Sequence, residues 1–156
     1  MQGSEPRMPR TFDEEIIGAQ EAAVVSTLTD LDRIDRIERE LRMGFDALAP
    51  VGAAASFFGS ARTPRDDPEY ALARETARLV GEDGMAVITG GGPGTMEAAN
   101  RGAQDAGALS IGLNIELPFE QGMNNWVELG LEFHYFFTRK VMFVRYASGF
   151  VVFPGG

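Results

Sequence analysis

The sequence predicts an α/β fold, a Rossmann-like parallel sheet flanked by helices and preceded by an N-terminal helical extension. From Val51 onward, short apolar segments alternate with helical stretches, which is typical of βαβ units. The apolar segments lack polar alternation, which indicates strands that are buried on both faces of a parallel sheet. The 19 glycines cluster, and several clusters directly follow an apolar segment.

The composition of the chain excludes several classes of partner. Its 156 residues carry a formal net charge of −9, which argues against binding a nucleic-acid polymer or an anionic membrane surface. A small phosphate in a local pocket stays compatible, because backbone N–H groups and one or two arginines suffice to hold it. There is no cysteine for a disulfide or a thiolate metal site. Without an apolar segment that suits a transmembrane helix or a signal peptide, we expect a cytoplasmic protein.

The first 50 residues are expected to form a tail and an amphipathic helix, and residues 51–156 a Rossmann-like domain. Residues 1–11 are polar and predict a disordered N-terminal segment. Residues 12–25 predict a short helix with acidic residues in its first turn. Thr29 is expected to cap the next helix. That helix is indicated by apolar residues at spacings of three and four: Leu31, Ile34, Ile37, Leu41, Phe45 and Leu48. We interpret it as a packing or dimer helix.

Five buried strands and three helices are predicted in the second part of the chain. The strands are expected at residues 53–58, 85–89, 109–113, 133–137 and 150–153. The helices are expected to open at Asp67-Pro68, at Pro93 or Gly94, and at Thr138, with the last running to Tyr146. Residues 117–131 are expected to be irregular.

Glycines, hydroxyl groups and cations are expected to gather at one edge of this sheet. The carboxyl ends of parallel strands meet at one edge, and ligands bind there. The residues that follow the predicted strands are therefore candidates for a binding site: Gly59, Ser60 and Arg62 after the first strand, Gly90, Gly91, Gly92, Gly94, Thr95 and Met96 after the second, Arg139 and Lys140 after the fourth, and Gly155 and Gly156 after the fifth.

The turn formed by residues 89–95 has the properties of an anion site. Successive glycines permit positive φ, so consecutive N–H groups can face one concave site. The helix that follows adds the positive end of its dipole. The alternative is a tight strand-to-helix turn without a ligand. A GxxxxGK[ST] P-loop is absent, and a GxGxxG dinucleotide fingerprint fails because position 95 is threonine.

Three cations near the strand ends are candidates for holding a phosphate. Arg62 and Arg139 can each offer a guanidinium group. A cation at a helix N-terminus opposes the dipole, so the position of Arg139 itself favours a nearby anion. Lys140 is a weaker candidate. For all three side chains, solvent exposure without a ligand is the alternative interpretation.

Other polar residues near the strand ends carry weaker signals. His134 is interpreted as a hydrogen-bonded core histidine, since there is no second histidine for a metal site, and no metal ion is expected. Glu97 lies in the first turn of the helix after the glycines. It is interpreted as a surface carboxylate favoured by the dipole, with a role at the site as the alternative. Residues past the third strand could contact a base or ribose: Asn114, Glu116, Asn124 and Asn125.

Three segments together resemble the LOG (Lonely Guy) family, whose members were long described as possible lysine decarboxylases. They are GGGPGTMEAAN at residues 90–100, the pair Arg139-Lys140, and PGG at residues 154–156. The resemblance extends from about Ala53 to the last residue and implies a Rossmann-like, usually dimeric protein. Characterised members are phosphoribohydrolases, which cleave the N-glycosidic bond of a nucleoside 5′-monophosphate to give free base and ribose 5-phosphate.

The resemblance implies roles for residues of this sequence. Gly59, Ser60 and the loop from Gly90 to Met96 would line the nucleotide site, and Arg139 would match the catalytic arginine. Residues 154–156 would begin the PGGxGTxxE motif, which contains the catalytic glutamate of the family. Because the sequence stops inside that motif, we expect a C-terminally truncated member with an incomplete Rossmann-like domain.

The resemblance predicts a hydrolase that acts on AMP or a cytokinin riboside 5′-monophosphate, assembles as a homodimer or higher homo-oligomer and needs no cofactor. One alternative is a non-catalytic carrier of a nucleotide or of the molybdenum cofactor. Another is a regulatory nucleotide-binding module. A decarboxylase is not supported, because a pyridoxal phosphate enzyme needs a Schiff-base lysine and the sequence shows no signature of one.

Overall fold

The computed structural model describes residues 11–17, 29–117 and 122–155. Its elements follow in the order α1 (Phe12–Ile17), α2 (Asp30–Leu48), β1 (Ala54–Phe58), α3 (Pro68–Glu82), β2 (Ala86–Thr89), α4 (Thr95–Asp105), β3 (Ser110–Ile115), β4 (Leu129–Phe133), α5 (Phe136–Tyr146) and β5 (Gly149–Val152). Residues 1–10 of the N-terminal segment predicted at 1–11, and residues 18–25 of the helix predicted at 12–25, lie outside the described residues. No described helix combines the length and the apolar character needed to cross a membrane.

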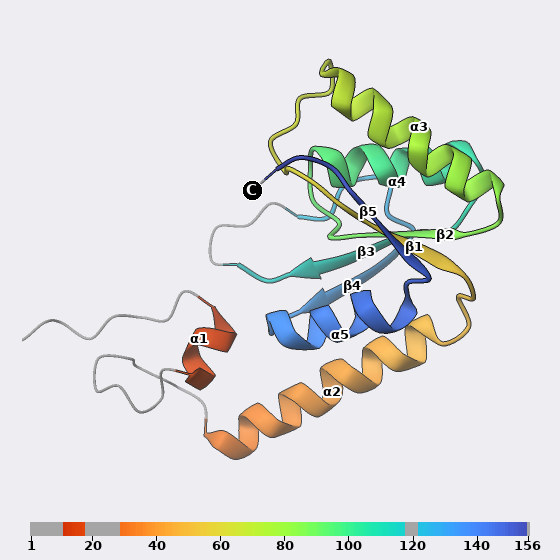
Figure 1. The fold of residues 1–156 in the computed structure, drawn as a ribbon. Helices are drawn as coiled ribbons and strands as arrows, with labels where there is room; N and C mark the ends of the chain where they lie inside the picture. The colour runs from red at the N-terminus through yellow and green to blue at the C-terminus, as the bar shows by residue number, and fades with distance from the viewer. Residues whose placement is uncertain (1–10, 18–28, 118–121, 156) are drawn as a thin grey trace, which may run out of the picture.

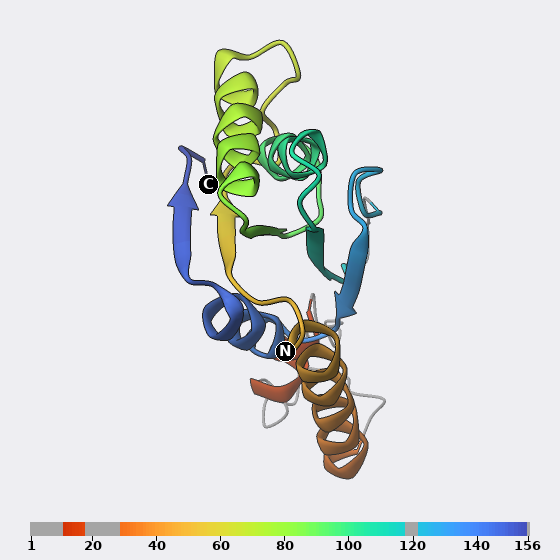
Figure 2. The same cartoon turned by 90° about the vertical axis from the view of Figure 1, so that its right-hand side faces the viewer.

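The five strands form one parallel sheet in the order β4-β3-β2-β1-β5. Helices α3 and α4 cover one face of the sheet, and α5 with α2 lies against the other (Figures 1 and 2). This layered arrangement confirms the predicted α/β, Rossmann-like fold with an N-terminal helical extension. The chain runs from β1 outward through β2, β3 and β4 and then returns to the other side of β1. The reversal puts the switch point of the topology, where such folds bind ligands, between β1 and β5.

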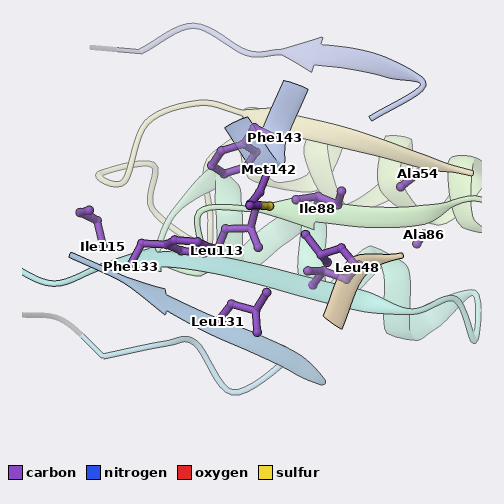
Figure 3. Packing of buried hydrophobic residues seen from close by; sticks show 11 residues of the cluster. Leu48, Ala54, Ala86, Ile88, Leu113, Ile115, Leu131, Phe133, Met142 and Phe143 are labelled. Atoms are coloured by element: carbon purple, nitrogen blue, oxygen red, sulfur yellow. The ribbon is translucent and has the colours of Figure 1, made fainter. Parts of the chain in front are cut away.

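Two apolar layers hold the helices against the sheet. On the α5 side, the buried layer is built mostly from large side chains and includes Ile111. Figure 3 shows other members of this layer gathered along the strands: Leu48, Ile88, Leu113, Leu131, Phe133, Met142 and Phe143. On the α3 and α4 side, the layer consists mostly of alanines, with Val87 and three aromatic rings: Ala55, Phe57, Tyr70, Ala73, Ala77, Val87, Ala98, Ala99, Ala103 and Phe153. Small side chains let α3 and α4 approach the sheet and each other closely.

The predicted helix starts at Thr29 and Asp67 are confirmed. The Thr29 side chain accepts a hydrogen bond from the amide of Asp32, and the Asp32 carboxylate accepts one from the amide of Thr29, so the two form a capping box. Asp67 caps α3 by accepting from the amide of Glu69, with Pro68 at the first helical position. Local sequence signals therefore determine where both helices begin.

The apolar stripe of α2 is covered only toward its C-terminal end. Leu48 is fully buried and Leu41 is half-buried, whereas 74% of Leu31 and 58% of Ile34 are exposed. The apolar contacts of α2 with the domain are therefore made toward its C-terminal end, and its first turns extend beyond α5 (Figure 1).

The prediction for the segment between β3 and α5 is wrong in two respects. The fourth strand runs from Leu129 to Phe133 rather than over residues 133–137, and α5 starts at Phe136. The cap of α5 is Tyr135, not Thr138, which lies three residues inside the helix. Aromatic residues favour strands in isolation. Here they belong to a helix start whose amides are satisfied by carboxylates distant in sequence.

Candidate functional site

The segments after β1, β2 and β5 contact one another at the carboxyl edge of the sheet. A Cβ atom built on Gly59 would meet the Thr95 side chain, and one built on Gly155 would lie 2.6 Å from the Ser60 nitrogen. The amide of Thr95 donates a 3.0 Å hydrogen bond to the Ser60 carbonyl. Gly94, with φ of +67°, has no room for a side chain because Ser60 and Ala61 press against it. Ser60 thus links the three turns.

A buried polar network fixes the conformation of the glycine turn, residues 90–94. Asn124 donates through Nδ2 to the carbonyls of Gly91 (3.2 Å) and Gly92 (2.9 Å). Thr89 Oγ1 accepts a 2.9 Å hydrogen bond from the amide of Gly91 and donates to Asn100 Oδ1. Asn100 is fully buried and donates in turn to Ser110 Oγ and the carbonyl of Ile111. The turn is therefore preorganised before any ligand binds.

Amides in the glycine turn and in the first turn of α4 have no acceptor among the described residues. The carbonyl of Gly91 faces Asn124, and the N–H of Gly92 belongs to the same trans peptide, so it points the opposite way. Among the described residues, the amides of Gly92, Gly94 and Met96 find no acceptor. Met96 lies in the first turn of α4, where the helix dipole adds positive potential. Three unpaired donors at this position suit an anion.

Arg139 lies against the glycine turn. Its Nε donates a 2.6 Å hydrogen bond to the carbonyl of Leu113 in β3, and its guanidinium carbon lies 5.2 Å from the ring centroid of Phe143. A Cβ atom on Gly90 would lie 2.5 Å from Arg139 Nη2 and 2.7 Å from the Met96 sulfur. The Arg139 guanidinium can lie this close to the turn only because position 90 is glycine.

The guanidinium of Arg139 is a partly buried cation without an acidic partner in the described part of the chain. Burial lowers the pKa of Arg139 to about 10, because removal from water penalises the charged form. The group remains protonated at neutral pH. A charge that is partly removed from water is stabilised by an opposite charge, which a bound phosphate would supply beside Gly90.

Several predicted site residues lie outside this cluster of contacts. Arg62 and Lys140 are exposed, Gly156 is not among the described residues, and Glu116 pairs with His134 Nε2 at 2.7 Å. Asn114 is buried within β3, and Asn125 lines a hollow of about 270 Å³ beside Pro93 and Glu97. The described residues contain no group of three His, Asp or Glu side chains that could hold a metal ion.

Two side chains have surroundings that differ from the sequence interpretation. Glu97 is only 8% exposed and accepts hydrogen bonds from Arg65 (2.7 and 3.1 Å) and Tyr70 (2.6 Å), so it is not a surface carboxylate. Burial raises the pKa of Glu97, but the hydrogen bonds from Arg65 and Tyr70 and the nearby arginine charges outweigh it and lower the pKa overall. His134 is hydrogen-bonded as expected but half-exposed rather than in the core.

Sequence reasoning missed Arg65 and the structural role of Asn124. Arg65 reaches Glu97 across 32 positions and stacks over Trp126 at 5.3 Å. Asn124 was a candidate for contacting a base, yet its amide group is used within the protein. A buried asparagine in an alanine-rich helix, Asn100, was the available signal of a polar network, because such a group requires partners.

The comparisons with known proteins agree with the fold. A family model described as the SLOG cluster4 family matches residues 53–156, more than half of the chain. No curated protein matches the sequence.

Solved structures share the architecture at low sequence identity. The molybdenum cofactor binding protein of Rippkaea orientalis is 20% identical with a TM-score of 0.55, over 67% of this chain and 63% of its own. The molybdenum cofactor carrier protein of Chlamydomonas reinhardtii is 20% identical with a TM-score of 0.54, over 67% and 64%. The protein TM1055 is 23% identical with a TM-score of 0.52, over 66% and 61%. This chain thus spans less than two thirds of the length of these structures.

Proposed function

Because this chain belongs to the SLOG cluster4 family, a LOG-like family, we propose that it binds the 5′-phosphate of a nucleotide at the glycine turn. The observation that carries the proposal is the combination of unpaired amides with a partly buried cation that has no acidic partner among the described residues. Gly92, Gly94 and Met96 supply the amides, and Arg139 supplies the charge beside Gly90. Helix N-termini and glycine-rich turns hold phosphate in this way.

We further propose that the whole protein is a phosphoribohydrolase acting on nucleoside 5′-monophosphates such as AMP. In this reaction the bond between ribose C1′ and the base nitrogen breaks, water supplies hydroxide to C1′, and the base leaves with a proton. Arg139 would stabilise negative charge on the substrate while the turn holds the phosphate. A carboxylate must stabilise the oxocarbenium-like ribosyl centre or activate the water. By the LOG resemblance it would be the glutamate of PGGxGTxxE, the motif that residues 154–156 begin.

A second candidate is a carrier that binds a nucleotide-like ligand without cleaving it. The observation that favours it is the likeness to two structures named as molybdenum cofactor binding and carrier proteins. A carrier needs the amides of the turn and the cation, but no carboxylate at the ribosyl carbon. The two candidates share phosphate recognition and differ in bond cleavage.

The experiment compares AMP with adenosine, which lacks the phosphate. We expect calorimetry to show AMP binding at least about tenfold tighter, since charge-assisted hydrogen bonds contribute about 1.5–3 kcal/mol each. Equal affinity for AMP and adenosine would refute phosphate recognition at the turn.

Chromatography of the same mixtures separates the two candidates. Release of adenine and ribose 5-phosphate from AMP supports the hydrolase, whereas AMP that is bound and recovered intact supports the carrier. In an active protein, Arg139→Ala should cost about 2–4 kcal/mol of transition-state stabilisation, as expected for one electrostatic stabiliser. An unchanged cleavage rate would remove Arg139 from the mechanism.

A further inference from the structure

We infer that Glu40 of α2, assisted by Asp13 of α1, is a positioning residue for Arg139. It acts by fixing the first turn of α5, the helix that carries the arginine. The inference rests on the proposed function in one respect, the role of Arg139 in binding the phosphate. The N-terminal helices α1 and α2 would then help to position the candidate site.

Glu40 is buried, with 5% of its surface exposed, and its carboxylate faces the start of α5. Oε1 accepts a 2.7 Å hydrogen bond from the amide of His134 and lies 2.6 Å from His134 Nδ1. Oε2 accepts from Thr138 Oγ1 at 2.6 Å and from the amide of Tyr135 at 3.4 Å. Both carboxylate oxygens are therefore committed to the segment that opens α5.

Asp13 satisfies the next two amides of the same helix. Oδ1 accepts from the amide of Phe136 at 2.5 Å, and Oδ2 accepts from the amide of Phe137 at 3.3 Å. The ring of Phe12 packs edge-on against His134, with 5.0 Å between ring centroids. Figure 1 shows α1 beside the start of α5 and α2 running along it. Two carboxylates from distant segments thus take the place of a local cap, which Tyr135 does not provide.

Arg139 lies in the turn that these carboxylates hold. Its amide donates to the carbonyl of Tyr135 at 3.3 Å, and its side chain donates to Leu113. One end of Arg139 is therefore fixed by the α5 start and the other by β3. Two negative charges at the N-terminus of α5 also complement the helix dipole, which Arg139 alone would oppose. If the first turn frays, the guanidinium loses its fixed position beside Gly90.

The test follows the Nε–H signal of Arg139 by NMR in the full chain without ligand. The signal is assigned by its loss in Arg139→Lys, and its exchange rate with water reports on the hydrogen bond to Leu113. We expect Glu40→Gln, which keeps the size but removes the charge and one acceptor, to speed this exchange by about tenfold. Asp13→Asn should act in the same direction. Glu38→Gln is the matched control, because Glu38 is an exposed residue of α2 that pairs with Arg42.

The outcomes separate positioning from general stability. Faster exchange at Arg139, while amides of β1 and β2 exchange at the native rate, supports the inference. An unchanged Arg139 signal in both Glu40→Gln and Asp13→Asn would overturn it. Equal acceleration at Arg139 and throughout the sheet would also overturn it, since Glu40 would then be only structural. The measurement needs no substrate, so a protein that fails to bind AMP would refute the proposed function and leave this inference standing.

Discussion

Replacing Gly90 by alanine changes the site through steric contact alone. Gly90 does not adopt positive φ, so an alanine introduces no backbone strain. Its Cβ would lie 2.5 Å from Arg139 Nη2, whereas ordinary contacts begin at 3.4 Å, so the guanidinium must retreat by about 0.9 Å. The Met96 sulfur, at 2.7 Å, must retreat by about 0.7 Å. Both atoms lie near the ends of flexible side chains, and we expect a loss of only about 1 kcal/mol in the free energy of unfolding.

The effect on ligand binding should be larger than the effect on stability. A shift of about 0.9 Å is enough to break one charge-assisted hydrogen bond to phosphate, which contributes about 1.5–3 kcal/mol. The dissociation constant for AMP should therefore rise by about 10- to 150-fold. Calorimetric titration measures this change, and urea unfolding measures stability in parallel.

The matched control is Gly149→Ala at the first residue of β5. A Cβ at this position would meet no atom within 4 Å, and Gly149 does not adopt positive φ. The control should bind AMP as the native protein does. If Gly90→Ala were to bind AMP with native affinity, Arg139 beside Gly90 would not be part of the anion site.

Two further substitutions test the network around the turn. Asn124→Ala removes the donors to Gly91 and Gly92 and should lower the free energy of unfolding by about 2–3 kcal/mol; AMP affinity should fall as well, and a variant of native stability would contradict the structural role of Asn124. Glu97→Gln tests the lowered pKa of Glu97. A depressed pKa contributes stability that is present above the unfolded value of 4.5 and is lost as pH falls through the folded pKa. The native protein should therefore lose stability more steeply than the variant below about pH 4.5 in urea unfolding, and parallel curves would count against the Arg65 and Tyr70 contacts.

The sequence predicted four of the five strands well, because they are largely apolar segments, whereas β4 contains Gly130 and Glu132 and was expected at residues 133–137. The starts of α2 and α3 were also predictable, since Thr29 and Asp67 cap through residues only two or three positions away. The start of α5 was not, because its amides bond to Asp13 and Glu40, 123 and 94 positions distant from Phe136 and His134. No local pattern reports contacts of that kind.

In the glycine turn, too, some features follow from the local sequence and others depend on residues distant in sequence. Its glycines predict an anion site, which stays a prediction, and the structure shows Arg139 against Gly90. The role of Asn124 depends on a tertiary contact with Gly91 across 33 positions. Glycine spacing predicts what a turn can do, whereas the side chains that hold it in shape come from elsewhere in the fold.

A structure of the protein crystallised with AMP tests the central claim most directly. We expect phosphate oxygens at hydrogen-bonding distance, about 2.7–3.2 Å, from the amide nitrogens of Gly92, Gly94 and Met96, with the Arg139 guanidinium beside them. A nucleotide phosphate bound elsewhere, with these amides still unpaired, would contradict the account.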